Sequence, residues 1–108
     1  MVSPTYFGTA ADVPSLVEVA HRRGVALVVD EAWGAHFAFH PLLPVDALSA
    51  GADLVVSSTH KMLTSLTQSA MLHLGPHADP RLDPAVVDRA VIMLESTSPN
   101  ALLAGSLD

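Results

Sequence analysis

Two charged residues stand just beyond apolar runs, where their side chains are free to do chemistry. Asp30 directly follows the run 25–29 (VALVV), and Lys61 comes shortly after the run 52–56. Charged side chains are seldom buried without a partner, and a flexible amine past a strand end is well placed to meet a ligand. An amine can hold a carbonyl cofactor as an imine, and an acid can keep a pyridine nitrogen protonated. The pair therefore suggests a site for a pyridine aldehyde.

The segments that must position this pair indicate alternating strands and helices. The runs 25–29 and 53–56 are rich in Val, which is typical of strands covered on both faces of a parallel sheet. Between residues 12 and 24, Asp12 is a good N-cap and Gly24 a good helix end. We therefore expect an α/β fold with a mostly parallel sheet and right-handed crossovers. Ligands bind outside the carboxyl ends of such strands, so the ends carrying Asp30 and Lys61 should lie about 5 to 10 Å apart.

Turn and capping residues predict the remaining elements. We expect a strand end at 2–8, a short helix at 45–50 stopped by Gly51, a strand at 68–74, a helix from the Asp83 cap to Glu95, and a helix over 101–107 after a cap at Ser98-Pro99.

Composition excludes several classes of protein. The 108 residues suffice for one small domain, and half of them are apolar, so a core-rich fold is expected. The net charge is −6, with no basic cluster beyond Arg22-Arg23, which argues against nucleic-acid and membrane partners. The chain has no cysteine, which removes disulfides and thiolate chemistry. No basic-then-apolar leader pattern begins the chain, so a cytoplasmic location is expected.

Other interpretations of these residues stay open on spacing alone. In the first alternative, Asp30 caps a loop and Lys61 is a solvated surface residue. Ser58-x-x-Lys61 fits the serine-lysine pattern of acylating enzymes, although no companion motif is present. His36 and His40 have metal-ligand spacing with Asp30 nearby, but Gly34 and Pro41 bracket them. His73 and His77 share that spacing, but Gly75-Pro76 lies between them, so no metal site is expected.

Four segments resemble a known family. VSPTYFG, DEAWGAHFAFH, GADLVVSSTHKMLTSLTQSAMLH and STSPNALLAGSLD are similar, in consistent order, to the large domain of the Orn/Lys/Arg decarboxylases. These are pyridoxal phosphate enzymes of the aspartate-aminotransferase fold. The resemblance implies a partial three-layer α/β/α major domain. It also implies that residues 1–108 are a fragment, with the N-terminal part of that domain and the C-terminal domain absent.

The same resemblance implies roles for individual residues. Lys61 matches the Schiff-base lysine, and Asp30 matches the acid at the pyridinium nitrogen. Ser58 matches a phosphate ligand, and His60 matches a histidine that contacts the cofactor beside the lysine. Lys61 or His60 would return a proton to the α-carbon after carbon dioxide leaves.

Further positions also match the family. Ala32 and Trp33 match residues that line the ring and phosphate side, although many members have His where Trp33 stands. Ser96 matches a hydroxyl offered to the cofactor of a neighbouring subunit. His36 and Trp33 also belong to an aromatic loop, and Tyr6 and Phe7 are expected in the core or a cleft wall.

The function implied is pyridoxal phosphate-dependent decarboxylation of lysine, ornithine or arginine by a full-length parent. That parent is expected to be a homodimer or higher homo-oligomer. Alone, the 108 residues are expected to bind cofactor poorly and to self-associate, because a half-sheet exposes an edge and an apolar face. Two alternatives stay open: an aminotransferase, which shares the imine and the electron sink, and a truncated remnant without catalysis.

Overall fold

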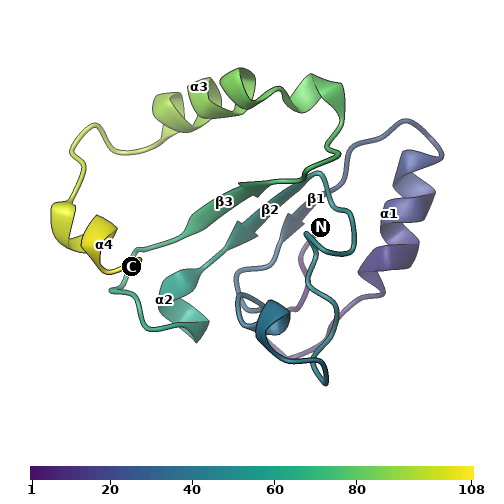
Figure 1. The fold of residues 1–108 in the computed structure, drawn as a ribbon, viewed down its shortest axis with the longest axis horizontal. Coiled ribbons are helices and arrows are strands. Elements are labelled where there is room, and N and C mark those ends of the chain that lie inside the picture. The colour runs from purple at the N-terminus through teal and green to yellow at the C-terminus, as the bar shows by residue number, and fades with distance from the viewer.

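The computed structural model describes residues 1–108 as a three-stranded sheet with helices around it (Figure 1). The α/β class expected from the sequence is confirmed. In chain order the elements are α1 (Val13–His21), β1 (Val28–Asp30), η1 (Phe37–Phe39), β2 (Leu54–Ser57), α2 (Thr59–Met62), β3 (Met71–Leu74), η2 (Pro80–Leu82), α3 (Pro84–Leu94) and α4 (Ala101–Gly105). No helix has the length and apolar character needed to cross a bilayer.

The sheet is mixed rather than mostly parallel. Its order is β1-β2-β3; β1 runs parallel to β2, and β3 runs antiparallel to it. Val2 adds an isolated parallel bridge to Asp30. The expectation of a mostly parallel sheet is wrong for β3 because residues 58–70 contain only the one-turn helix α2. With so short a connection, the next strand begins at the same end of the sheet where β2 ends and must run antiparallel to it. A parallel neighbour would need a crossover to the opposite end of the sheet.

β1 is shorter than the apolar run that predicted it. The Val25 N–H donates to the Ala20 carbonyl, which completes the end of α1, and the Leu27 N–H donates to the Asp53 carboxylate. These donors are therefore lost to the strand ladder. Val28 is 43% exposed, so the prediction of a strand covered on both faces is also wrong within this chain.

One face of the sheet carries the buried core. Val29 and Val55 are partners across β1 and β2, and α1 packs on them through Val13 and Val17. Ala47 belongs to the same cluster. The start of α1 is as predicted: Asp12 accepts a hydrogen bond from the Ser15 N–H, and a proline occupies the first turn.

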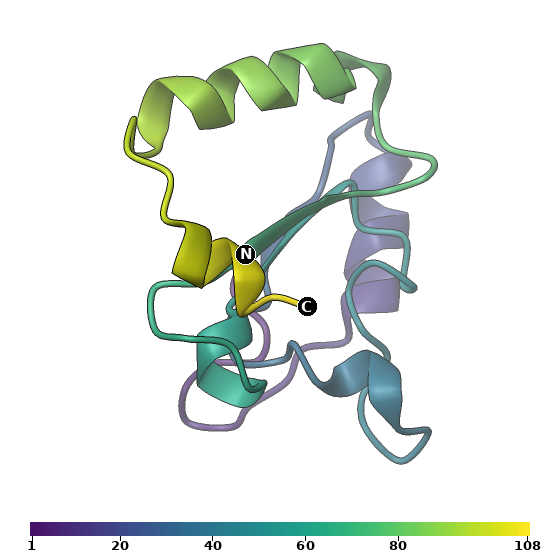
Figure 2. The same ribbon diagram turned by 60° about the vertical axis from the view of Figure 1, so that its left-hand side comes forward.

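The other face is open beneath α3. Figures 1 and 2 show α3 as an arm held away from the strands, and none of its residues is buried. An apolar cavity of about 470 Å³ separates α3 from Leu54 and Leu72 of the sheet. The helix itself was predicted correctly: Asp83 accepts a hydrogen bond from the Ala85 N–H, and Pro84 is its first residue.

Two predicted helices need correction. The segment 45–50 forms a hydrogen-bonded turn, in which the Ala50 N–H donates to the Asp46 carbonyl, rather than a helix. So short a segment gains too few hydrogen bonds to offset the cost of starting a helix. Near the end of the chain, α4 is capped by Asn100 rather than at Ser98-Pro99, and it spans Ala101–Gly105.

Candidate functional site

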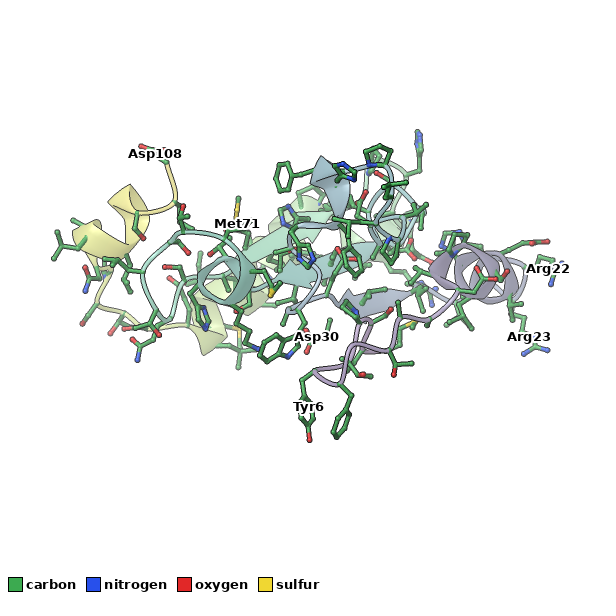
Figure 3. The ribbon with its side chains drawn as sticks, turned by 90° about the horizontal axis from the view of Figure 1, so that it is seen from below. Tyr6, Arg22, Arg23, Asp30, Met71 and Asp108 are labelled. Atoms are coloured by element: carbon green, nitrogen blue, oxygen red, sulfur yellow. The ribbon has the colours of Figure 1, made fainter.

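The carboxyl ends of β1 and β2 border a pocket of about 320 Å³. Its lining residues are Asp30, Ala32, Trp33 and Lys61, together with Val2, Thr5, Tyr6 and Phe7 of the N-terminal segment. Figure 3 shows Asp30 and Tyr6 on the same side of the molecule. The volume falls within the range of small-molecule sites. Four of the seven sequence-predicted site residues are thus brought together.

Asp30 reaches the pocket from the end of β1. Its Oδ1 accepts a hydrogen bond from the Ala32 N–H at 3.0 Å, so the carboxylate caps the turn that follows the strand. Its backbone carbonyl accepts from the Ser3 N–H at 3.0 Å. Oδ2 has no protein partner. The loop-capping interpretation of Asp30 is therefore right for one oxygen, and the second oxygen is free for a ligand.

Lys61 enters the same pocket from α2. Its Nζ lies 4.7 Å from the centroid of the Trp33 ring, which is a cation–π distance. No carboxylate lies within ion-pair distance of this amine. Lys61 is the single lysine and Trp33 the single tryptophan of the sequence. The amine is therefore held against an aromatic wall without being neutralised by an acid.

Ser58 and His60 lie beside Lys61 in the chain but do not line the pocket. The Ser58 hydroxyl is 3.1 Å from His60 Nδ1, and that nitrogen is 2.7 Å from the Ser69 carbonyl. A carbonyl can only accept, so Nδ1 is the donor in this contact. These two contacts fix the orientation of the His60 ring beside Lys61 in the chain.

Ser96 lies outside the pocket of its own chain. It is exposed in the connection between α3 and α4, and its hydroxyl accepts from the Ser98 N–H at 3.1 Å. His36 packs edge-on against Phe37, with ring centroids 5.0 Å apart, and its Nδ1 is buried without a partner. No three His, Asp or Glu side chains are grouped closely enough to hold a metal ion.

Glu31 is a buried acid that the sequence interpretation passed over. It is 4% exposed, and its Oε1 accepts a hydrogen bond from the Ala47 N–H at 2.8 Å. Burial raises the pKa of Glu31 to about 7; the Ala47 bond opposes this rise, and the charge of Asp46 adds to it. A signal was present: strand alternation sends the side chain after Asp30 to the opposite, core-bearing face.

Asp53 is a second buried acid, and it ties three segments together. It is 2% exposed; Oδ2 accepts from the Leu27 N–H at 2.6 Å and lies 2.8 Å from His21 Nε2, and Oδ1 accepts from the Asp79 N–H at 2.7 Å. Burial alone would raise the pKa of Asp53, but the hydrogen bonds from His21, Leu27 and Asp79 together hold it below its ordinary value.

Comparison with known proteins identifies the family. The family model described as Orn/Lys/Arg decarboxylase, major domain, matches residues 1–108. The chain belongs to the Orn/Lys/Arg decarboxylase family. The resemblance expected from the sequence is confirmed, and the match covers the residues that line the pocket with Asp30 and Lys61.

Two relatives of this Orn/Lys/Arg decarboxylase chain carry more specific names. Arginine decarboxylase of Bacillus subtilis (strain 168) is 44% identical over 108 residues, which is all of this chain and 21% of the relative. Lysine decarboxylase LdcA of Pseudomonas aeruginosa is 31% identical over 115 aligned residues, again covering all of this chain but 15% of the relative. The chain thus spans about a fifth or less of the length of these curated relatives.

Proposed function

We propose that this chain carries part of the pyridoxal phosphate site of a decarboxylase that acts on a basic amino acid. One observation carries the proposal: Lys61 and Asp30, from two different elements, line a single pocket that Trp33 also walls. An amine and a carboxylate in one pocket are the two groups that a pyridine aldehyde requires. The aspartate-aminotransferase fold is part of the same proposal.

The residues present fit this cofactor. Lys61 Nζ is unpaired with any acid, so it is free to bind an aldehyde carbon covalently. Asp30 Oδ2 is free to accept a hydrogen bond from a ring nitrogen while Oδ1 stays on the Ala32 N–H. The Trp33 ring offers a flat apolar surface beside both. Ser58 would serve the phosphate only by sharing the hydroxyl that now contacts His60.

The side chains divide the chemical work. When bound, the cofactor supplies the electron sink for the pair of electrons released as the substrate carboxylate leaves as carbon dioxide. Asp30 would hold a proton at the ring nitrogen, because a carboxylate within hydrogen-bond reach stabilises a neighbouring cation. Trp33 would exclude water from one side of Lys61.

Two groups are candidates to move a proton at the end of the reaction: Lys61, which lines the pocket, and His60, which lies next to it in the chain. Lys61 carries the amine, and the His60 ring is oriented by the contact of its Nδ1 with the Ser69 carbonyl. A base oriented by a second hydrogen bond is ready to accept or return a proton. We assign this step to Lys61, with His60 as the alternative.

Arginine is the substrate we propose first. The relatives named arginine decarboxylase are 41 to 44% identical to this chain, whereas the one named lysine decarboxylase is 31% identical. We also propose a homo-oligomer. The exposed hydroxyl of Ser96, which lies outside its own pocket, would then serve the cofactor of a neighbouring subunit.

The decisive experiment is reductive labelling of the full-length protein with pyridoxal phosphate and borohydride, followed by peptide mapping. Within these residues only Lys61 and a chain-terminal amine are able to react, so we expect the label on Lys61 and its loss in Lys61→Ala. A matched control is Arg89→Ala, which removes an exposed cation of α3. Label that persists elsewhere in Lys61→Ala would refute the assignment.

Product analysis then separates the reaction types. A decarboxylase releases carbon dioxide from arginine, ornithine or lysine, and the relative rates rank the three substrates. An aminotransferase instead consumes a 2-oxo acid and leaves the substrate carboxylate intact. Labelled Lys61 without either product would leave a cofactor-binding protein without these activities.

A further inference from the structure

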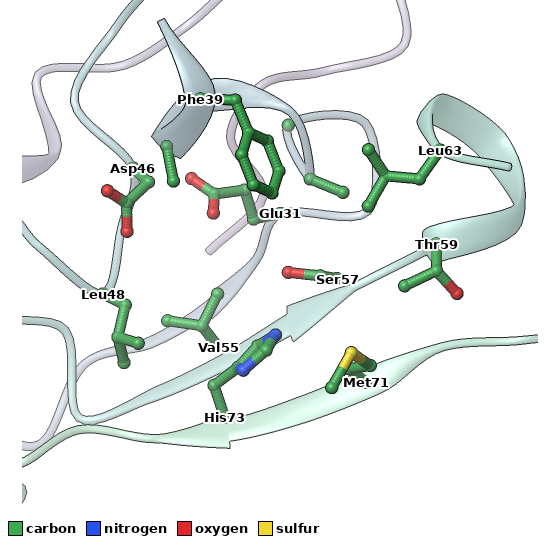
Figure 4. Close-up of a pocket in the computed structure, with 13 residues that line it drawn as sticks. Glu31, Phe39, Asp46, Leu48, Val55, Ser57, Thr59, Leu63, Met71 and His73 are labelled. Atoms are coloured by element: carbon green, nitrogen blue, oxygen red, sulfur yellow. The ribbon is translucent and has the colours of Figure 1, made fainter. Parts of the chain in front are cut away.

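Glu31 has no part in the proposed chemistry, yet it lies between residues that do. Asp30 and Ala32 line the Lys61 pocket, and the Glu31 side chain points to the other face of the sheet. There it faces a cavity of about 190 Å³ (Figure 4). Asp46 and His73 are the other titratable groups in that lining. The acid is therefore joined to the candidate site through its own backbone.

Three hydrogen bonds hold Glu31 in place, two through its backbone and one through its carboxyl group. Its N–H donates to the Val56 carbonyl at 2.8 Å, and its carbonyl accepts from the Gly34 N–H at 2.8 Å. Its Oε1 accepts from the Ala47 N–H at 2.8 Å. A Cβ at Gly34 would come within 2.7 Å of both Glu31 Cγ and Pro4 Cδ, so the turn closes tightly over this side chain.

The backbone of residues 30–34 therefore depends on where the Glu31 carboxyl is fixed. A rotation at Glu31 would move Asp30 and Ala32 together, because the Ala32 N–H is bonded to Asp30 Oδ1. Trp33 follows in the same turn. A buried side chain with a fixed partner constrains the backbone that carries it more than an exposed one does.

We propose that Glu31 is a positioning residue, whose bond to the Ala47 N–H holds the 30–34 turn so that Asp30 and Trp33 face Lys61. The identity of the ligand rests on the proposed function, but the hold on the turn does not. Glutamine is nearly the same shape and keeps the acceptor oxygen, whereas alanine removes it. The two replacements therefore separate acceptor geometry from charge.

The closed turn should become less favourable as Glu31 ionises, although a carboxylate accepts more strongly from the Ala47 N–H than a carboxylic acid does, because the cost of burying the charge is the larger effect. Burial makes the charged form costly and raises the pKa of Glu31 to about 7, and the neighbouring charge of Asp46 adds to that cost. Ionisation would draw water into the cavity that Asp46, Ser57 and His73 share with it. The turn should therefore be tightest at acidic pH and loosen through neutrality.

Trp33 reports this turn directly in the full-length protein once any tryptophan outside the 108 residues is replaced by phenylalanine, because it is the single tryptophan within them. It is 38% exposed, so release of the turn should raise its acrylamide quenching by about twofold. We expect that rise in Glu31→Ala and not in Glu31→Gln. Glu18→Gln, which removes an exposed acid of α1, is the matched control and should match the wild type.

The pH profile supplies a readout that a simple loss of packing would not change. Between about pH 5 and pH 9, quenching in the wild type should rise with a midpoint near 7, and Glu31→Gln should lack that transition. If Glu31→Ala unfolds, as judged by loss of its far-ultraviolet circular dichroism spectrum, the inference is tested by comparing the pH profiles of the wild type and Glu31→Gln. Equal quenching in folded Glu31→Ala and wild type, or the same transition in Glu31→Gln, overturns the inference.

A second measurement keeps this inference apart from the proposed function. Borohydride labelling of Lys61 by pyridoxal phosphate should need about tenfold more cofactor in Glu31→Ala than in Glu31→Gln. If the wild type leaves Lys61 unlabelled, the proposed function fails, and the Trp33 result still decides the role of Glu31. If label appears with equal midpoints in both variants, Glu31 does not position the site.

Discussion

Glu31 and Asp53 are both buried acids, yet their surroundings move their pKa values in opposite directions. At Glu31 burial dominates, since only the Ala47 N–H offsets it, and the pKa rises to about 7. At Asp53 burial is outweighed by donors from His21, Leu27 and Asp79, and the pKa falls below its ordinary value. The number of converging donors, rather than depth alone, decides which form of a buried carboxyl group is stable.

The raised pKa of Glu31 predicts a pH-dependent stability. Its pKa is higher in the folded state than the ordinary 4.5, so the folded chain binds more protons than the unfolded one between 4.5 and about 7. The free energy of unfolding should therefore fall as pH rises through that window, by roughly 3 kcal/mol in total. Urea unfolding at a series of pH values should show this fall in the wild type and a flatter profile in Glu31→Gln. Parallel profiles would contradict the assignment.

Asp53→Asn should destabilise the fold by about 2 to 4 kcal/mol. Asparagine keeps one acceptor oxygen, but its amide group would meet backbone donors such as the Leu27 or Asp79 N–H. Asp88→Asn, an exposed position on α3, is the control and should be close to neutral. The urea midpoint measures both changes. Equal midpoints for the two variants would remove Asp53 from its structural role.

At this scale the sequence predicted some positions and not others for identifiable reasons. Asp30 and Lys61 were found because charged residues after apolar runs mark strand ends, where parallel strands gather their ligands. Glu31 was open to the same logic through strand alternation. Asp53 was not, since its partners His21 and Asp79 come from segments distant in sequence.

Among the elements, the end of β3 depends on one small residue. A Cβ at Gly75 would lie 2.5 Å from the Ala52 carbonyl oxygen, and backbone cannot move aside as a side chain can. Gly75→Ala should therefore destabilise the chain by about 1 to 3 kcal/mol in urea unfolding. Gly105→Ala in α4, where a Cβ meets nothing within 4 Å, should be neutral or slightly stabilising. The reverse order of the two variants would contradict this account.

The starts of α1 and α3 were predicted correctly, whereas the lower limit of β1 was not, and the cause is physical. Asp12 and Asp83 each precede a proline and cap a helix through their own side chains, so the signal is local. The lower limit of β1 was missed because the Asp53 side chain takes the Leu27 N–H, which lies 26 residues away. An acceptor that comes from a distant segment and takes a strand N–H cannot be predicted from the local sequence pattern.

At the scale of the whole molecule, the main feature is the open face of the sheet beneath α3, which leaves the chain less compact than a typical domain of its size. The accessible surface is 7322 Å², against about 5,700 Å² expected for a compact monomer of this mass. The radius of gyration is 14.3 Å, above the roughly 13 Å of a compact domain of similar length. Only 16 of 108 residues are buried, so much apolar surface on α3 and the sheet faces solvent.

We predict that the isolated 108 residues self-associate through this surface. Apolar patches of this extent favour contact with other chains, and Ile92, Met93 and Leu94 of α3 are among the most exposed. Sedimentation velocity should show mass rising with protein concentration. Leu94→Asp should reduce the effect, while Asp88→Asn on the same helix should not. A monomer at all concentrations would contradict the prediction.

The position of β3 at the end of the order β1-β2-β3 has one more consequence. Along Met71–Leu74, every second N–H and carbonyl is directed away from β2, where no further strand pairs with it. The strand contains no Lys, Arg, Asp, Glu or Pro, the residues that commonly prevent edge strands from pairing with other chains. A fourth strand could join there by main-chain bonding alone. The segment that forms this fourth strand would then be selected by its ability to lie extended and in register with β3, rather than by the shape of its side chains.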